Sequence, residues 1–245
     1  MNNQGVLYIA FGDLYIKEAI VSAESVKQYN PNLHITLMCD NNIDSKYIDN
    51  VVLINATHIR AKVDYIDQTP YEQTIFLDSD TIIDHSLDDL FQLLDKYDFC
   101  IAHDYARKRQ NIADIIPEYA NIPYAFSEVN PGVIAFKNND NVKGFFNKWR
   151  DLFYKYHDVM IYEQPTFRVA LWEAEMKLYI LPPEFNARSK DCRNKSKKLK
   201  ERFGNRHLEP RIYHLHANKN ISQGVFKYED YKKCLKICKK NVYPI

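Results

Sequence analysis

Alternating apolar runs and helical stripes in the N-terminal part of the chain restrict the fold more than any other feature of this sequence. Runs with the length and the β-branched or aromatic content of buried strands occupy residues 6–11, 34–39, 51–54 and 75–77. Between the first two runs, apolar side chains recur at helical spacing from 16 to 26, until Asn30 and Pro31 stop the pattern. Strands joined by such a crossover helix form parallel βαβ units. The sequence therefore predicts an α/β protein with a mainly parallel central sheet flanked by helices.

The rest of the chain extends this sheet and its helical layers. Further strands are predicted at 99–102, 133–136, 178–181 and 211–216, and further helices at 59–67, 87–94, 142–153, from 163 onward and over 221–245. Residues 103–129 have little hydrophobic periodicity. A long irregular segment inside a domain often has a function, such as shaping a binding site. Since no repeat, low-complexity tract or linker interrupts the chain, we expect one domain over residues 1–245.

Two aspartates, Asp78 and Asp80, follow directly on the apolar run at 75–77. An extended backbone would point both side chains the same way. The repulsion between them would then be relieved by a hard divalent cation whose shell is completed by phosphate oxygens. A solvated turn that carries two acids is the alternative interpretation. Because ligands of parallel sheets bind beyond the carboxyl ends of the strands, Asp13 and Asp40, which also follow predicted strands, are expected at the same edge.

The charge balance excludes a strong overall attraction to polyanions. Lys and Arg number 33 against 32 Asp and Glu, for a net charge of +1, so we expect no nucleic-acid partner. Residues 188–211 are the local exception, with ten basic and three acidic side chains. This segment is either a solvated surface or a mobile flap that neutralises a phosphate-rich ligand.

The N-terminus lacks the basic-then-apolar pattern of a signal peptide. No apolar run approaches the ~18 residues that span a bilayer. The sequence thus predicts a cytoplasmic protein without a transmembrane segment. Five cysteines include no CxxC pair, and Cys39 and Cys100 lie in apolar runs, so we expect both as reduced core residues.

Six short segments, in this order and spacing, resemble the GT-A nucleotide-sugar glycosyltransferases, most closely the glycogenin-like and galactosyltransferase-like group called family 8. The segments are 11–15, Lys62, 76–81, 130–133, 163–164 and 213–216. The resemblance extends from about residue 6 to 220. It implies a single Rossmann-like GT-A domain, with the nucleotide bound by about 6–102, the acceptor by about 103–220, and a C-terminal helix at 221–245.

For the donor, the resemblance implies a nucleotide sugar, with a UDP-sugar preferred. Tyr15 would stack on the uracil, with Ala10 and Asp13 nearby. The other donor-binding positions implied by the family pattern are Lys62, Asp78, Ser79, Asn130, Gly132 and Lys219. Glycine at 132 permits close backbone approach to a ligand.

For the metal, the resemblance implies Mn²⁺ held by Asp78, Asp80 and His214, with Mg²⁺ as an alternative. An imidazole beside two carboxylates suits Mn²⁺ better than Ca²⁺, which is a reason independent of the resemblance. The family pattern has a lysine six residues after the metal-binding histidine. Lys219 lies five residues after His214 and three after His216, which leaves the choice between the two histidines open.

For catalysis, the resemblance places Glu163 and Gln164 at the reacting face of the sugar, together with Lys62. Glu163 stands where the family has aspartate, and Pro131 lies inside the Asn-x-Gly segment. Similarity implies retention of anomeric configuration. Retention by double displacement needs a carboxylate nucleophile. Since an amide is a poor nucleophile, front-side attack is the expected route.

Two other functions remain open from the sequence. A nucleotidyltransferase that makes a nucleotide sugar could use a similar sheet, but it would need a Gly-rich phosphate loop after the first strand, and the chain has only 6 glycines. A non-catalytic nucleotide-sugar-binding relative is the second alternative. The acceptor, whether glycan, protein or small molecule, has no decodable signature, and a homo-oligomer is compatible with the sequence.

Overall fold

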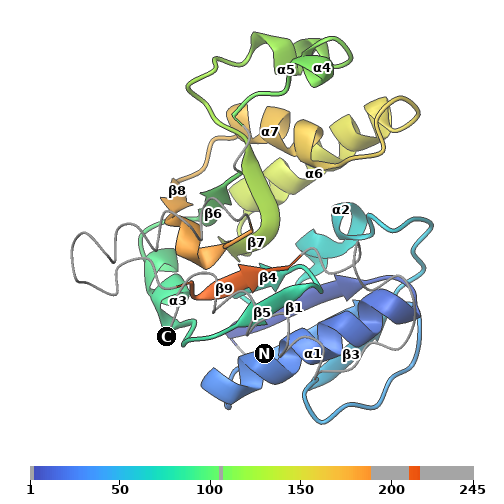
Figure 1. The fold of residues 1–245 in the computed structure, drawn as a ribbon, viewed down its shortest axis with the longest axis vertical. Coiled ribbons are helices and arrows are strands. Elements are labelled where there is room, and N and C mark those ends of the chain that lie inside the picture. Colours follow the sequence, from blue (N-terminus) through green and yellow to red (C-terminus); the bar gives the residue numbers. More distant parts are fainter. Residues whose placement is uncertain (1–2, 105–106, 189–209, 216–245) are drawn as a thin grey trace, which may run out of the picture.

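The computed structural model describes residues 3–104, 107–188 and 210–215. Within them, seven strands form one sheet in the order β3-β2-β1-β4-β7-β6-β8, and two more form a small second sheet (Figure 1). The strands of the large sheet are β1 (Gln4–Ala10), β2 (His34–Cys39), β3 (Asn50–Leu53), β4 (Gln73–Leu77), β6 (Phe99–His103), β7 (Val129–Lys137) and β8 (Leu178–Leu181). The small sheet pairs β5 (Thr81–Ile83) with β9 (Ile212–His214).

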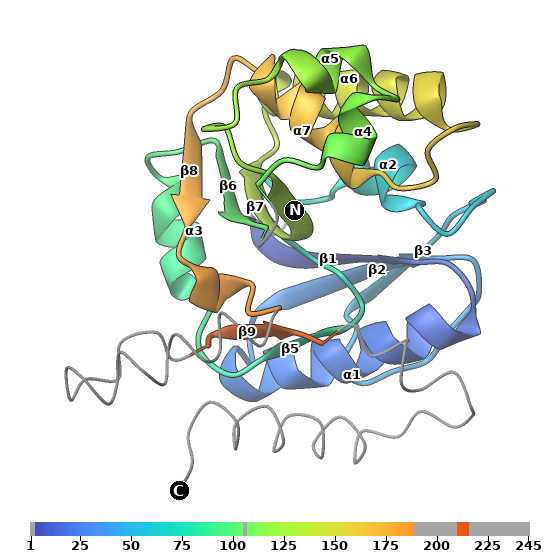
Figure 2. The same ribbon diagram turned by 45° about the horizontal axis from the view of Figure 1, so that its top comes forward.

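Helices cover both faces of the large sheet. The α-helices are α1 (Asp13–Tyr29), α2 (Lys62–Tyr65), α3 (Asp88–Leu94), α4 (Gln110–Ala113), α5 (Pro117–Asn121), α6 (Asp140–Tyr156) and α7 (Gln164–Trp172). Two 3₁₀ turns, η1 (Ile66–Gln68) and η2 (Pro183–Phe185), complete the described elements. In Figure 2, α1 lies on one side of β1 and β2, and α6 and α7 lie on the other.

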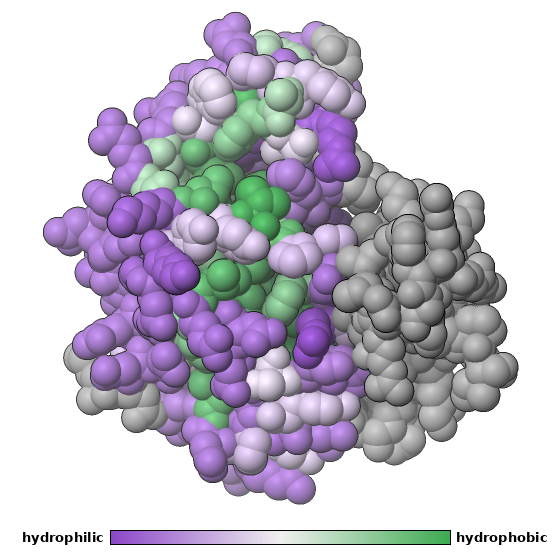
Figure 3. Space-filling model, turned by 90° about the vertical axis from the view of Figure 1, so that its left-hand side faces the viewer, coloured by the Kyte–Doolittle hydropathy of each residue, from purple (hydrophilic) through white to green (hydrophobic). Residues whose placement is uncertain are grey.

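Strand directions confirm the predicted mixed, mainly parallel sheet. Parallel pairs join β1 to β2, β1 to β4, β2 to β3 and β6 to β8, whereas β7 runs antiparallel to both β4 and β6. The central strands are buried on both faces, which explains why they appear in the sequence as continuous apolar runs rather than alternating ones. The edge strand β8 is only half-buried over most of its length. On the side of the molecule that carries β8 and α3, apolar side chains form a band between polar ones (Figure 3).

Two apolar cores sandwich the sheet. Aromatic side chains of α6 and α7, among them Phe145, Trp149 and Phe167, pack on one face. The predicted stripe of α1, including Ile16 and Val26, packs on the other face with α3. Cys39 and Cys100 are buried with free thiols, as expected. In the described part of the chain, no helix has the length and apolar character that crossing a membrane requires.

One face of α1 is buried but polar, which the apolar pattern did not predict. Ser22 Oγ lies 2.8 Å from Tyr8 Oη and 2.9 Å from Thr81 Oγ1, and Ser25 Oγ accepts a hydrogen bond from the Ile83 backbone N–H at 2.9 Å. These bonds tie α1 to β5, the strand that follows the two aspartates.

Several boundaries differ from the sequence prediction. The helix expected at 59–67 is α2 followed by η1, and residues 103–129 contain the short helices α4 and α5. The strand around Gly132 begins at Val129, so the Asn-Pro-Gly segment is part of β7. The helix predicted at 221–245, Lys219, His216 and most of the basic segment at 188–211 lie outside the described residues.

Candidate active site

A cavity of roughly 630 Å³ opens beyond the carboxyl ends of β1 and β4. The predicted site residues that line it are Ala10, Tyr15, Lys62, Asp78, Ser79, Asp80, Asn130, Glu163, Gln164 and His214. Two predicted site residues, Asp13 and Gly132, are outside its lining. Asp13 accepts a hydrogen bond from Asn41, and Asp40 accepts one from the Gly12 N–H at 2.9 Å. That second bond fixes the turn between β1 and α1, where Gly12 has a φ of 88° that favours glycine.

Of the two conformations that the sequence left open for the aspartates, an extended strand and a turn, the structure has the turn. The Thr81 N–H donates to the Asp78 carbonyl at 3.2 Å, which closes the turn between β4 and β5. Antiparallel pairing of β5 with β9 then sets Thr81 opposite His214. His214 Nε2 lies 3.1 Å from Asp80 Oδ1 and 3.7 Å from Asp78 Oδ2. Residues far apart in the sequence therefore converge on one point.

The donor set fits a divalent cation. One ligand atom each from Asp78, Asp80 and His214 lies within 4.8 Å of the others. Ligands that share a cation at about 2.1 Å are separated by about 3 to 4.2 Å, and the two distances to His214 Nε2 fall in this range. Mixed imidazole and carboxylate ligation favours Mn²⁺ over Ca²⁺. These three residues are the candidate metal ligands.

The second ring nitrogen of His214, Nδ1, forms a hydrogen bond with Asn186. Nδ1 lies 3.0 Å from Asn186 Oδ1, and Asn186 donates its amide to Asn130 Oδ1 at 2.8 Å. Since Asn186 uses its amide hydrogens in this way, its oxygen accepts from Nδ1–H, which leaves the Nε2 lone pair for a cation. Asn186 follows η2 and had no signal in the sequence.

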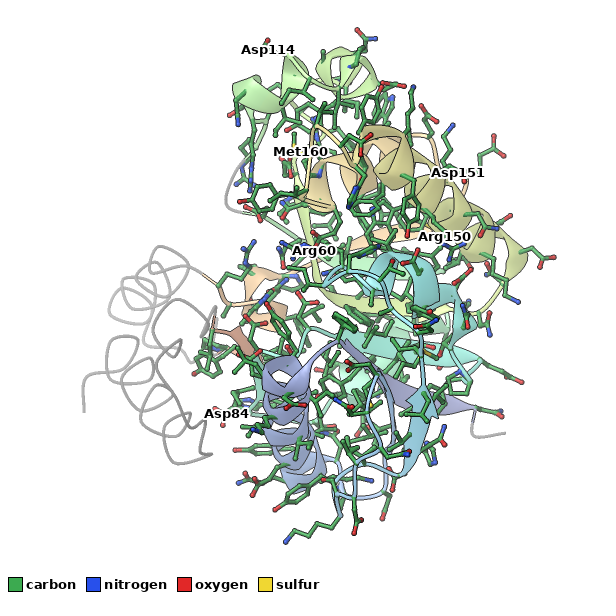
Figure 4. All side chains as sticks on the ribbon, turned by 90° about the vertical axis from the view of Figure 1, so that its right-hand side faces the viewer. Arg60, Asp84, Asp114, Arg150, Asp151 and Met160 are labelled. Atoms are coloured by element: carbon green, nitrogen blue, oxygen red, sulfur yellow. The ribbon has the colours of Figure 1, made fainter. Side chains whose placement is uncertain are left out.

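Lys62 is the first residue of α2, and it forms ion pairs with Asp78 in the turn after β4 and with Glu163 at the start of α7. Its Nζ lies 3.0 Å from Asp78 Oδ1 and 3.1 Å from Glu163 Oε1. Arg60 Nε is 3.2 Å from Glu163 Oε2 and lies at the junction of the sheet and the helical layer (Figure 4). Burial alone would lower the pKa of Lys62, but the carboxylates of Asp78 and Glu163 raise it. Burial would likewise raise the pKa of Glu163, but Lys62 and Arg60 hold it below its usual range, so Lys62 and Glu163 both stay charged.

Gln164 begins α7 and contacts two buried acids that the sequence analysis did not identify. Its Nε2 donates to Asp104 Oδ2 at 3.1 Å and to Glu128 Oε2 at 2.8 Å. Asp104 also pairs with Arg188. Asp104 directly follows β6, two residues after the predicted strand at 99–102, so an acid near a strand end was the available signal for it. Glu128 directly precedes β7 but lies in the segment predicted to be irregular, so it had no such signal.

Glu18 is a third missed acid, and it lies behind the aspartate turn. Ser79 Oγ donates to Glu18 Oε2 at 2.9 Å, so the Ser79 side chain is directed to α1. The Glu18 side chain is fully buried, and its Oε1 has no hydrogen-bond partner among the described residues. Burial, together with the charges of Asp80 and Asp78, raises the pKa of Glu18 to about 7.

Comparison with known proteins matches this architecture to one family and to several solved structures. Residues 73–230 match the family model of the nucleotide-diphospho-sugar transferases. No curated protein matches the chain. The fold is similar to galactosyltransferase LgtC, crystallised with donor and acceptor sugar analogues, at 13% identity over 95% of both chains with a TM-score of 0.64. It is similar to the glycosyltransferase GlyE of Streptococcus pneumoniae TIGR4, at 17% identity over 94% of this chain and 60% of that one (TM-score 0.61). Mouse xyloside xylosyltransferase 1 has 14% identity over 89% of this chain and 99% of its own (TM-score 0.58).

Proposed function

The chain belongs to the nucleotide-diphospho-sugar transferase family and has the GT-A fold, and from this premise we propose that it transfers a sugar from a UDP-sugar to an acceptor, with retention and with Mn²⁺. The observation that carries the proposal is the convergence of Asp78, Asp80 and His214 at one wall of the cavity, beside Lys62. In an open α/β sheet, this position beyond the carboxyl ends of the strands is where ligands bind.

The three candidate metal ligands would hold the cation on the diphosphate side of the cavity. Bound Mn²⁺, or Mg²⁺ in its place, would supply Lewis-acid stabilisation of the leaving diphosphate. Lys62 fixes the position of Asp78 through their 3.0 Å contact. The same ammonium adds positive charge where the leaving group becomes negative.

The nucleoside would lie at the junction of β1 and α1. Ala10 and Tyr15 line the cavity there, and Tyr15 offers a flat ring for stacking on the base. Asn130 also lines the cavity and would contact the donor sugar. Gly12 is the one glycine of the turn between Ala10 and Asp13, so this turn lacks the Gly-rich phosphate loop that a nucleotidyltransferase would need.

Front-side attack is the route that best fits the residues around the reacting centre. A double displacement requires a free carboxylate at the far face of the sugar. Glu163 is held by Lys62 and Arg60 instead. Gln164 presents an amide, which is a poor nucleophile. We therefore assign Gln164 to orientation of the donor sugar and stabilisation of the charge that develops on it, with Glu163 in support.

A donor-hydrolysis screen across nucleotide sugars with Mn²⁺ tests the proposal without knowledge of the acceptor. We expect hydrolysis of a UDP-sugar, lost on the order of 100-fold or more in Asp78→Ala, Asp80→Ala and His214→Ala. Asp151→Ala is the matched control, since Asp151 is exposed on α6 and away from Arg60 (Figure 4). Mn²⁺ with UDP should also raise the Tm of the wild type but not of the three variants. Absence of hydrolysis and of any nucleotide-dependent shift in Tm would overturn the proposal.

A further inference from the structure

The amide group of Gln164 has a defined orientation. Its nitrogen lies 3.1 Å from Asp104 Oδ2 and 2.8 Å from Glu128 Oε2, and both acids are buried. Burial raises the pKa of Glu128, which the hydrogen bonds from Tyr119 and Gln164 and the charges of Arg109 and Arg168 oppose, and Asp104 is paired with Arg188. As carboxylates, both acids accept hydrogen bonds and donate none, so both contacts require N–H groups. The two amide hydrogens of Gln164 are therefore used on the protein side. Its oxygen is left as the polar atom that can face the cavity, which Gln164 lines.

Glu128 is itself fixed by a tyrosine that can donate in only one direction. The Arg109 backbone N–H donates to Tyr119 Oη at 2.8 Å, so the phenolic hydrogen of Tyr119 is directed to Glu128 Oε1. The Arg168 guanidinium lies 4.5 Å from the centre of the Tyr119 ring and holds it in place. One Glu128 oxygen thus accepts from Tyr119 and the other accepts from Gln164.

We propose that Glu128 is a positioning residue that, with Asp104, holds the Gln164 amide with its oxygen toward the cavity and its nitrogen toward the protein. This inference rests on the proposed function. Positive charge develops at the anomeric carbon as the bond to the diphosphate breaks. An amide oxygen directed to that carbon stabilises the charge, whereas an amide NH₂ in its place would oppose it.

The alternative is that Glu128 only satisfies the buried hydroxyl of Tyr119. Glu128→Gln distinguishes the two roles, because the new side chain has nearly the same shape. Tyr119 donates to one atom of residue 128, so that atom must be the new amide oxygen. The new NH₂ then faces the NH₂ of Gln164. Two donors in contact disfavour the wild-type orientation, whereas the reversed orientation sets the Gln164 oxygen against Asp104 Oδ2. Gln164 therefore no longer holds its oxygen toward the cavity.

We expect Glu128→Gln to lower kcat for donor hydrolysis on the order of 100-fold, with KM for the donor changed less than threefold and a Tm close to that of the wild type. A rescue experiment uses Tyr119→Phe, which removes the constraint on residue 128. In the double variant Tyr119→Phe/Glu128→Gln, the new amide can turn its oxygen to Gln164. The double variant should therefore be at least tenfold more active than Glu128→Gln alone. Tyr119→Phe by itself should stay within about threefold of wild type, since the carboxylate still accepts from Gln164.

A second readout is independent of turnover. In protein with ¹⁵N-labelled glutamine side chains, the NH₂ signal of Gln164 is assigned by its loss in Gln164→Glu. Both of its protons should exchange slowly with solvent in the wild type and rapidly in Glu128→Gln. If the Gln164 NH₂ protons exchange slowly in a wild type that hydrolyses no nucleotide sugar, the positioning role stands and the proposed function is rejected. Fast exchange of these protons in the wild type would overturn the positioning role. Full activity of Glu128→Gln, or an equal loss of kcat in Glu128→Gln and in the double variant, would overturn it as well.

Discussion

The imidazole of His214 packs directly on the backbone of Gly132. A Cβ at position 132 would stand 2.2 Å from His214 Cε1 and 2.7 Å from Nδ1, closer than atoms in real proteins approach. Glycine at this place in β7 therefore permits the close approach of a candidate metal ligand, whatever else it does for a donor sugar.

Gly132→Ala should displace His214 and weaken Mn²⁺ binding by at least tenfold, because a displaced ring also loses the contact between Nδ1 and Asn186 that orients it. Titration calorimetry with Mn²⁺ measures the effect. Gly144→Ala is the matched control, since a Cβ there meets nothing within 4 Å and the exposed helical site favours alanine by about 0.5–1 kcal/mol. Equal Mn²⁺ affinity in Gly132→Ala and the wild type would remove His214 from the metal site.

Asn186→Leu should lower Mn²⁺ affinity by about 10- to 100-fold while leaving the three candidate ligands in the chain. The amide of Asn186 orients the His214 ring and sets which nitrogen carries the proton, and leucine cannot accept that hydrogen bond. Unchanged affinity would show that the ring needs no such support.

The sequence predicted the order of elements well, and it failed where the outcome depends on contacts between distant segments. Apolar runs identified the central strands because these are buried on both faces. The sequence left open whether the Asp78–Asp80 segment is extended or forms a turn, because the turn is stabilised by pairing of β5 with β9 from the far end of the chain. Lys62 was placed near the diphosphate by resemblance alone, and its contact with Glu163 depends on how α2 meets α7.

Most of the missed site residues share one property. Arg60, Asp104, Glu128 and Glu18 are charged side chains without a motif of their own, and each contacts a predicted residue rather than forming part of a pattern. Asn186 is the uncharged exception. Periodicity detects which face of an element is buried, but it assigns charged residues to solvent by default. Only the packing of α1 and α7 against the strand ends shows that the three acids are buried.

Lys62→Met should destabilise the protein by about 3–5 kcal/mol, because it removes the cation from two carboxylates, one of them nearly fully buried. Urea denaturation at pH 7 measures the loss. The double variant Lys62→Met/Glu163→Gln should recover part of the stability, since it removes a buried charge at position 163 that has Arg60 but no longer Lys62 as a partner. If both variants were equally unstable, lost packing rather than charge would be the cause.

Glu18 should make the metal-free protein less stable as the pH rises. The folded-state pKa of about 7 lies above the ordinary value of 4.5, so the carboxyl is more easily ionised in the unfolded chain. The contribution of Glu18 to the free energy of unfolding is fully present below pH 4.5 and is lost as the pH rises through about 7. The difference of about 2.5 in pKa corresponds to a loss of about 3 kcal/mol at most.

Glu18→Gln should abolish this loss, so that in EDTA the variant is more stable than the wild type at pH 8 but not at pH 4.5. Thermal unfolding across this pH range is the measurement, with Glu24→Gln on the same helix as the control. Saturating Mn²⁺ should reduce the difference in stability between Glu18→Gln and the wild type at pH 8. A cation beside Asp80 offsets the repulsion between the Asp80 and Glu18 carboxylates. A parallel pH dependence of wild type and Glu18→Gln would mean that Glu18 ionises in the folded protein as readily as in the unfolded chain.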